Sequence, residues 1–214
     1  WVVNASDRTI IAHFLGTAAN GVYSIANKFP NVFINFYNIL NLSWTETVSL
    51  HFDDEDRDEF LTETMTSLFK LFAAACFGIV ACMPFVFPIL INEKYVAGYD
   101  QILILMYAML FRVLVGLYSC IYVAQKNAKK IAYTSISAAI INITVNLILI
   151  NKIKIFAASI STLVAFFSMF IIRYIDVNKT VHMRIRKPII IGSILIGTML
   201  IGTYYCENKM IQLI

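Results

Sequence analysis

Charged residues are scarce in this 214-residue sequence. Asp, Glu, Lys and Arg together make up 14% of it, against roughly 25% in ordinary soluble domains. Apolar residues make up 59%, and the mean hydropathy is +0.74. This combination excludes a soluble globular enzyme, a disordered chain and a secreted disulfide scaffold, and it predicts an integral membrane protein.

Motifs for metal binding and catalysis are also missing. The four cysteines form no CxxC pair and the three histidines share no ligand spacing, so the sequence predicts no metal site and no cofactor. It contains no GxxxxGK[ST] loop, no GxSxG and no HExxH, so we expect no enzymatic activity. The net charge of +4 is interpreted as a record of membrane topology, not of nucleic-acid binding.

Long uncharged runs are what the sequence does contain. Most are close to the ~20 residues that cross a bilayer as a helix, and they are too continuous for the strands of a membrane barrel. We predict an all-α membrane protein, a polytopic transmembrane helix bundle with six complete spans and a truncated one before Asp7. The six runs are 21–49, 71–92, 101–125, 131–151, 155–172 and 188–206.

Basic residues are divided unevenly between the two sides that these spans define. Nine fall on one side and five on the other, so the first side is predicted to be cytoplasmic. The two groups of basic residues are Arg57, Lys126, Lys129, Lys130, Arg173, Lys179, Arg184, Arg186 and Lys187, against Arg8, Lys94, Lys152, Lys154 and Lys209.

The chain starts at Trp1 and stops in an apolar stretch, so we expect a segment of a longer protein.

A stripe of polar side chains follows the span 21–49 at steps of three and four residues. It falls within an arc of roughly 120° on a helix, opposite an apolar face that includes Phe33, Phe36 and Trp44. Unpaired amides are costly in hydrocarbon, so this face should meet either the polar side chains of other helices or a hydrated cavity. Pro30 is expected to kink this helix. The stripe consists of Asn20, Ser24, Asn27, Asn31, Asn35, Asn38, Asn41, Thr45 and Ser49.

Arg112 lies in the middle of an apolar span, where a charge costs roughly 2.5–3.5 kcal/mol. Two interpretations remain open: an ion pair with Asp7 or Glu46, or an anion site for a substrate phosphate. Asn142 and Asn146 form a second polar pair, for which a helix–helix hydrogen bond is the simpler interpretation. The candidate substrate-cavity residues are Lys28, Asn27, Asn31, Asn35, Asn38, Arg112, Asn142 and Asn146.

Several motifs, taken in order over residues 1–180, resemble one family. The match departs at Phe156, where the family usually has Gly, and in residues 43–46, where a Pro is often found. The motifs are Asp7-Arg8, Gly21-Val22-Tyr23-Ser24-Ile25-Ala26-Asn27-Lys28, the turn at 122–130, Thr134-Ser135 with Asn142-Ile143 and Asn146, the segment 157–162, and Arg173. Together they resemble the C-terminal half of polysaccharide flippases of the O-antigen and teichoic-acid type, in the multidrug/oligosaccharidyl-lipid/polysaccharide exporter superfamily.

The resemblance implies one lobe of a two-lobed, fourteen-helix exporter in the bacterial cytoplasmic membrane. Residues 1–180 would form the C-terminal-lobe helices, from a truncated helix 7 to helix 12. Residues 181–214 would form helix 13 and the start of helix 14. The implied partners are a lipid-linked oligosaccharide substrate, the lipid bilayer and the N-terminal lobe of the same chain.

Two other functions compete with a flippase. A drug/cation antiporter of the same superfamily would use intramembrane carboxylates, and only Asp7 and Glu46 approach the spans. The cationic Lys28 and Arg112 favour an anionic substrate instead. A membrane glycan polymerase or ligase would need a long outer loop with catalytic groups, and none of the predicted outer loops is long.

Overall fold

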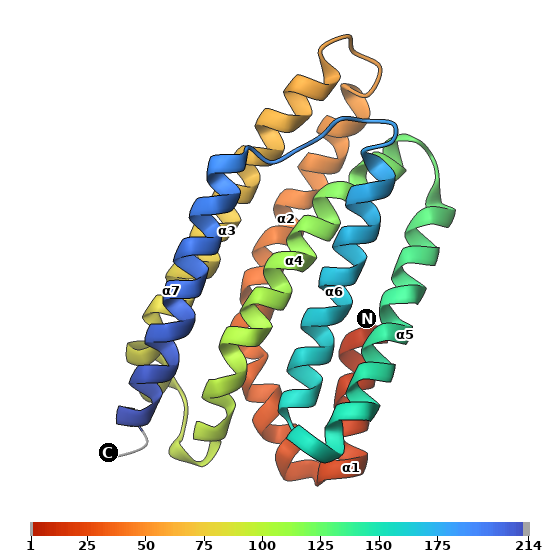
Figure 1. The fold of residues 1–214 in the computed structure, drawn as a ribbon. Helices are drawn as coiled ribbons and strands as arrows, with labels where there is room; N and C mark the ends of the chain where they lie inside the picture. Colours follow the sequence, from red (N-terminus) through yellow and green to blue (C-terminus); the bar gives the residue numbers. More distant parts are fainter. Residues whose placement is uncertain (1, 212–214) are drawn as a thin grey trace.

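Figure 1 shows a computed structural model of the chain, which describes the backbone of residues 2–211 and the side chains of residues 5–206. Within these residues the structure consists of helices joined by short connections and one longer extended segment, without a β-strand. Five helices are long and apolar enough to cross a membrane, which confirms the prediction of an all-α, multi-pass membrane helix bundle. They are α3 (Arg57–Leu90), α4 (Tyr99–Ala124, preceded by the short helix η1, Glu93–Gly98), α5 (Ala128–Ile153), α6 (Phe156–Val177) and α7 (Lys187–Ile211).

The first helix, α1 (Val2–Ala26), differs from the expected truncated span. It does not end before Asp7 but continues to a sharp break at Gly16, where φ is 86° and ψ is 174°. Residues with a side chain rarely adopt this conformation, and glycine adopts it easily. The break turns the chain at the lower end of the bundle in Figure 1, so that the short second half of α1 leads into the next helix.

The second helix, α2 (Lys28–Leu50), corrects the expected span 21–49. That span is divided at Asn27, and α2 is not among the five strongly apolar helices because its many Asn, Ser and Thr residues lower its hydropathy. The interruption expected from Pro30 is present, but it falls one turn earlier, at Asn27. Pro30 is the third residue of α2 and has no N–H to donate to the Ala26 carbonyl, so the helical hydrogen bonds do not run unbroken from α1 into α2.

The connections alternate between the two ends of the bundle. Segments 51–56, 125–127 and 178–186 lie at one end (top in Figure 1), and 91–98 and 154–155 lie at the other. The count of basic residues on the two sides assumed this same division of the connecting segments between the two ends. Which end faces the cytoplasm stays a prediction. The expected start of a further helix falls in residues 212–214, which lie outside the described residues, as does the side chain of Lys209.

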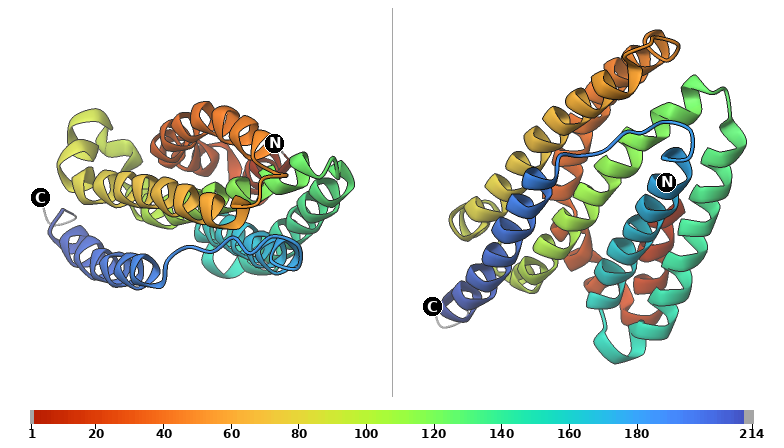
Figure 2. Two further views of the ribbon diagram at one scale, coloured as in Figure 1. Left: turned by 90° about the horizontal axis from the view of Figure 1, so that it is seen from above. Right: turned by 45° about the horizontal axis from the view of Figure 1, so that its top comes forward.

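Helix α4 forms the centre of the bundle, because it packs against every other α-helix, and the right-hand view of Figure 2 shows it between α2 and α6. Of its apolar span 61% is buried, against 28% for α5 and 11% for α7, so α5 and α7 are the most exposed of the five apolar helices. Helix α2 approaches α4 closely at Gly116, where a Cβ atom would lie 2.0 Å from the hydroxyl of Tyr37. Trp44 fixes the same pair of helices by donating from Nε1 to the Leu117 carbonyl at 3.2 Å.

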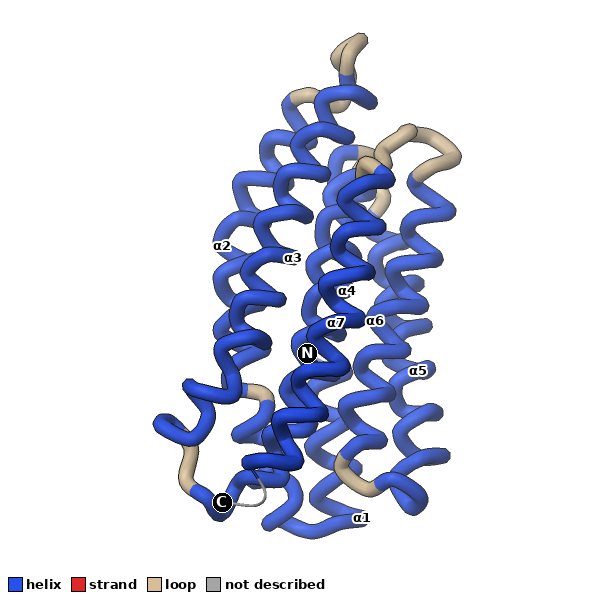
Figure 3. The backbone as a smooth tube through the Cα atoms, turned by 60° about the vertical axis from the view of Figure 1, so that its left-hand side comes forward, coloured by secondary structure: helices blue, strands red, loops and turns tan. Residues whose placement is uncertain are grey.

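An extended segment, residues 178–186, connects α6 to α7 across the end of the bundle (Figure 3). Alternate backbone N–H groups of this segment donate to side chains spaced four apart on α3. The pairs are His182 with Asp58, Arg184 with Thr62 and Arg186 with Thr66, at 3.1, 3.3 and 3.4 Å. These contacts hold the start of α7 beside α3, and α7 then packs along α3.

Candidate transport site

Asp7 is a fully buried carboxylate where α1 meets α5 and α6. Five side chains donate to its two oxygens, and none of them carries a positive charge. The donors are Tyr23 (3.1 Å), Asn142 (3.1 Å), Asn146 (2.8 Å), Ser161 (3.4 Å) and Thr162 (2.5 Å). Hydrogen bonds to neutral donors thus compensate for the water that this carboxylate loses on burial.

Asn142 and Asn146 are one helical turn apart on α5 and belong to this cluster around Asp7. Both are fully buried, so they contact other helices and do not line an open cavity in this structure. This corrects their assignment as cavity residues and agrees with the helix–helix hydrogen bond proposed for the pair. The carbonyl oxygen of the Asn146 side chain is buried without a hydrogen-bond partner.

Arg173 of α6 is a second buried charge, and it is only 2% exposed. Its Nε and Nη2 donate to the Thr134 hydroxyl at 3.0 and 2.9 Å, and its Nη1 donates to the Val115 carbonyl at 3.1 Å. The Ser119 hydroxyl also accepts from Nη1. Within the part of the chain that the structure describes, no carboxylate forms a salt bridge with this guanidinium. Arg173 therefore joins α4, α5 and α6 through neutral acceptors alone.

Arg112 of α4 lies in a different environment. It is partly exposed, its Nη1 is 4.0 Å from the Met109 sulfur, and its guanidinium carbon lies 5.8 Å from the centre of the Phe166 ring. The expected ion pair with Asp7 or Glu46 is absent, because no described carboxylate lies within salt-bridge distance of it. Among the described residues, Arg112 is thus a cation inside an apolar span that has no charged partner and donates no strong hydrogen bond.

The polar stripe on α2 runs from a helix contact to an exposed edge. Asn41 and Thr45 meet α4, where the Cys120 sulfur lies 3.7 Å from the Asn41 side-chain oxygen and 3.2 Å from the Thr45 hydroxyl. Asn35 and Asn38 are exposed, and Asn31 is partly buried. One part of the stripe, Asn41 and Thr45, therefore packs against α4, and another part, Asn35 and Asn38, points away from the bundle.

The apolar face expected opposite the stripe is only partly buried. Phe33 and Trp44 are in the core, whereas Phe36 is 48% exposed. The exposed residues of α2 are mixed in polarity. Asn38 and Phe36 are about 160° apart at 100° per residue, but Leu42, which is 76% exposed, is only about 40° from Asn38.

Tyr37 connects the stripe to the arginines. Its hydroxyl donates to the Asn41 side-chain oxygen at 2.6 Å, and it lies within electrostatic range of Arg112 and Arg173. Across the contact between α2 and α4, Tyr37 thus links Asn41 of the stripe with the surroundings of Arg112.

Lys28 and Asn27 lie at the start of α2, away from the middle of the bundle. Asn27 is 8% exposed and its side-chain amide donates to the Tyr23 carbonyl at 2.9 Å, so it caps the junction of α1 and α2. Lys28 is exposed, as a snorkelling lysine would be. Neither residue is brought together with Arg112.

Sequence reasoning missed two members of the buried network. Asp7 was considered as a partner for Arg112, as a motif residue and as a carboxylate near the spans, and Arg173 as a motif residue and a basic residue of the cytoplasmic side. Neither was placed in a buried hydrogen-bond network. The signal for Asp7 was available: a carboxylate in a helical run and two asparagines four residues apart are complementary in an apolar setting. For Arg173 no local pattern predicts that Thr134 and Ser119 will meet it.

Comparison with protein-family models, with curated proteins and with solved structures found no match.

Proposed function

We propose that the chain forms part of a membrane exporter, one that moves a lipid-linked oligosaccharide across the cytoplasmic membrane. The observation that carries this proposal is Arg112, a partly exposed guanidinium within an apolar span that no described carboxylate neutralises. A permanent cation in that position is costly unless water or an anion meets it. A diphosphate that enters from the water phase would supply the anion.

Arg112 of α4 and the exposed amides of α2 suit the polar half of such a substrate. The planar fork of Arg112 can bind two phosphate oxygens at once, and the exposed amides of Asn35 and Asn38 can donate to and accept from sugar hydroxyls. The lipid tail would remain in the bilayer, against which the apolar surfaces of the bundle lie. The opposite wall of the cavity would come from an N-terminal lobe of the same protein.

Export of a surface glycan in cells that lack their own flippase tests this proposal. We expect Arg112→Lys and Arg112→Ala in the full-length protein to reduce export at least about tenfold while the protein accumulates to its normal level, because lysine cannot replace the two-oxygen fork. Lys94→Ala, at an exposed lysine in η1, is the matched control and should export normally. Normal export by both Arg112 variants would refute the substrate role.

The buried carboxylate of Asp7 favours a second candidate, a drug/cation antiporter. Its neighbours supply oxygen atoms from Ser161, Thr162 and the unpartnered side-chain carbonyl of Asn146, and such a set can exchange a proton or a small cation. Under this function the transported drug is cationic, and Arg112 has no part in binding it.

Uptake of a cationic dye into inverted vesicles separates the two functions. An antiporter predicts uptake driven by a proton or sodium gradient, abolished by Asp7→Asn and unaffected by Arg112→Ala. The exporter of an anionic lipid-linked glycan predicts no gradient-driven dye uptake in the unaltered protein, together with the loss of glycan export in Arg112→Ala.

A further inference from the structure

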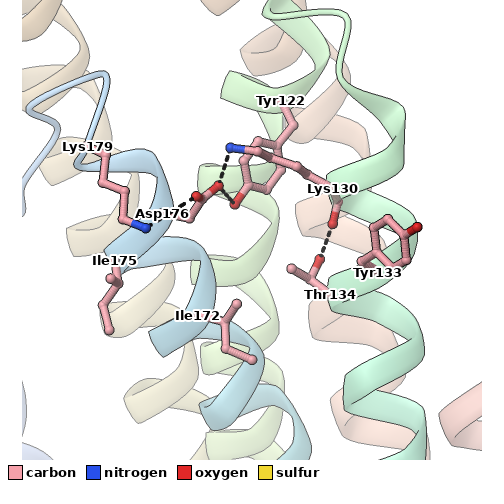
Figure 4. Close-up of a pocket in the computed structure, with 8 residues that line it drawn as sticks. All are labelled: Tyr122, Lys130, Tyr133, Thr134, Ile172, Ile175, Asp176 and Lys179. Atoms are coloured by element: carbon pink, nitrogen blue, oxygen red, sulfur yellow. Dashed lines mark hydrogen bonds and ion pairs between the residues drawn. The ribbon is translucent and has the colours of Figure 1, made fainter.

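A cavity of about 420 Å³ lies between α5 and α6, at the end of the bundle that carries segments 125–127 and 178–186. Figure 4 shows the charged groups meeting across its upper part, with apolar side chains of α6 nearer the middle of the bundle. Neither the polar stripe of α2 nor Arg112 contributes to it. Its principal lining residues are Lys130, Tyr133, Ile172, Ile175, Asp176 and Lys179.

Positive charge predominates around this cavity. Asp176 holds Lys130 at 2.6 Å, whereas Lys179 is 3.9 Å from the same carboxylate and its side chain is 68% exposed. Arg173 lies directly behind the wall, because its guanidinium donates to the Thr134 hydroxyl, and Thr134 also lines the cavity. Three cations thus surround one carboxylate, and Lys179 is the cation that is free to move toward a ligand.

The other half of the cavity is apolar and open to the surroundings of the bundle. Ile172 is 41% exposed, Ile175 is 55% exposed and Tyr133 is 71% exposed. These residues continue the lipid-exposed surfaces of α5 and α6, two helices that are apolar enough to span the membrane. A soluble anion would use only the charged half, whereas a ligand with an anionic head and a hydrocarbon tail would use both.

We propose that this cavity binds an anionic phospholipid, with its phosphate beside Lys179 and Lys130, the two lysines that flank Asp176, and an acyl chain along Ile172 and Ile175. The cavity lies where two membrane-spanning helices end, which is the level of lipid headgroups. Basic pockets between spanning helices on the cytoplasmic side are suited to such headgroups. The exposed Tyr133 supports the same level, since aromatic side chains with a polar end prefer the membrane interface.

Lipid retention by the full-length protein tests the proposal. The purified protein is mixed with phosphatidylglycerol or with phosphatidylcholine of the same acyl chains, and bound lipid is counted by native mass spectrometry. We expect phosphatidylglycerol to bind at least about tenfold more tightly. Each lysine near an anionic headgroup contributes roughly a fivefold gain in affinity, so Lys130→Gln with Lys179→Gln should weaken binding about twenty-fivefold.

The opposite end of the same helix pair offers a matched control. Lys152→Gln with Lys154→Gln removes two exposed lysines where α5 joins α6 and should leave phosphatidylglycerol binding unchanged. Because Lys130→Gln also leaves Asp176 without its close partner, Lys179→Gln alone is the second variant. It preserves the 2.6 Å ion pair and should still weaken binding about fivefold.

Inorganic phosphate distinguishes a lipid site from a simple anion site. We expect inorganic phosphate at about 10 mM, a large excess for a weak anion site, to displace little phosphatidylglycerol. Phosphate has no hydrocarbon chain to bind to the apolar half of the cavity. Displacement by phosphate, equal binding of the two lipids, or an equal loss in the control variant would each overturn the proposal. The melting temperature of every variant, recorded without added lipid, shows that the protein is folded.

Discussion

Arg112 and Arg173 are two guanidinium groups in one helix bundle with opposite surroundings. Arg173 is 2% exposed and donates to hydroxyl and carbonyl oxygens on α4 and α5. Arg112 is partly exposed and contacts only an aromatic ring and a sulfur atom among the described side chains. Hydropathy singles out Arg112 because it interrupts an apolar run, yet Arg173 is the arginine that the fold satisfies completely.

This difference distinguishes an arginine that stabilises the fold from an arginine whose charge is available to bind a ligand. A buried charge persists in a folded protein when fixed dipoles replace its water, and Thr134, Ser119 and the Val115 carbonyl do this for Arg173. Nothing comparable is fixed around Arg112. We therefore expect Arg173 to act on stability and Arg112 to act on transport.

Truncating Arg173 should have the largest effect on stability. Arg173→Ala leaves a cavity between α4, α5 and α6 and removes the hydrogen bonds that join them, at a cost of about 3 kcal/mol. Thermal unfolding of the full-length protein in detergent measures this cost. Arg112→Ala is the control, and similar melting temperatures for the two variants would contradict the distinction between them.

Replacing the main acceptor of Arg173 should have an intermediate effect. Thr134→Val keeps the shape of the side chain but leaves Nε and Nη2 without the hydroxyl, at a cost of about 1–2 kcal/mol. Ser137→Ala, at an exposed hydroxyl on the same helix, should cost less than about 0.5 kcal/mol.

A double-mutant cycle sharpens this test. In the Arg173→Ala background, Thr134→Val should become nearly neutral, because the hydroxyl no longer has a guanidinium to bind. An unchanged penalty would show that Thr134 stabilises the protein through its bond to the Lys130 carbonyl instead.

The smallest effect on stability is expected at Arg112. Its ring contact at 5.8 Å and its sulfur contact at 4.0 Å are weak, so Arg112→Ala should change the free energy of unfolding by less than about 1 kcal/mol. Urea or thermal unfolding monitored by circular dichroism checks this. A loss as large as that of Arg173→Ala would mean that Arg112 is a structural residue.

The fold was largely predictable because hydropathy is a local property. The runs 71–92, 101–125, 131–151, 155–172 and 188–206 each correspond to one of the five apolar helices. The predicted helix boundaries were wrong around α1 and α2, because neither the break at Gly16 nor the start of α2 is marked by a change in hydropathy.

The candidate site was predictable only in part. Periodicity placed Asn35 and Asn38 on one face of α2, and both are exposed there. It could not show that Asn142 and Asn146 face Asp7 across 135 residues or more of sequence, because such a contact depends on how helices pack. Partners that are distant in sequence leave no periodic pattern, so Arg112 could not be separated from Arg173 before the structure.

The central claim is that Arg112 and the polar edge of α2 line a water-filled cavity. Labelling of single cysteines with a small anionic thiol reagent tests it most directly, in a full-length protein whose four native cysteines, all free in the structure, are replaced by alanine. We predict that Arg112→Cys and Asn38→Cys react. Met109→Cys, at a buried position on α4, and Phe36→Cys, on the lipid-facing side of α2, should stay unlabelled. An unreactive Arg112→Cys, or equal labelling of Asn38→Cys and Phe36→Cys, would contradict the account.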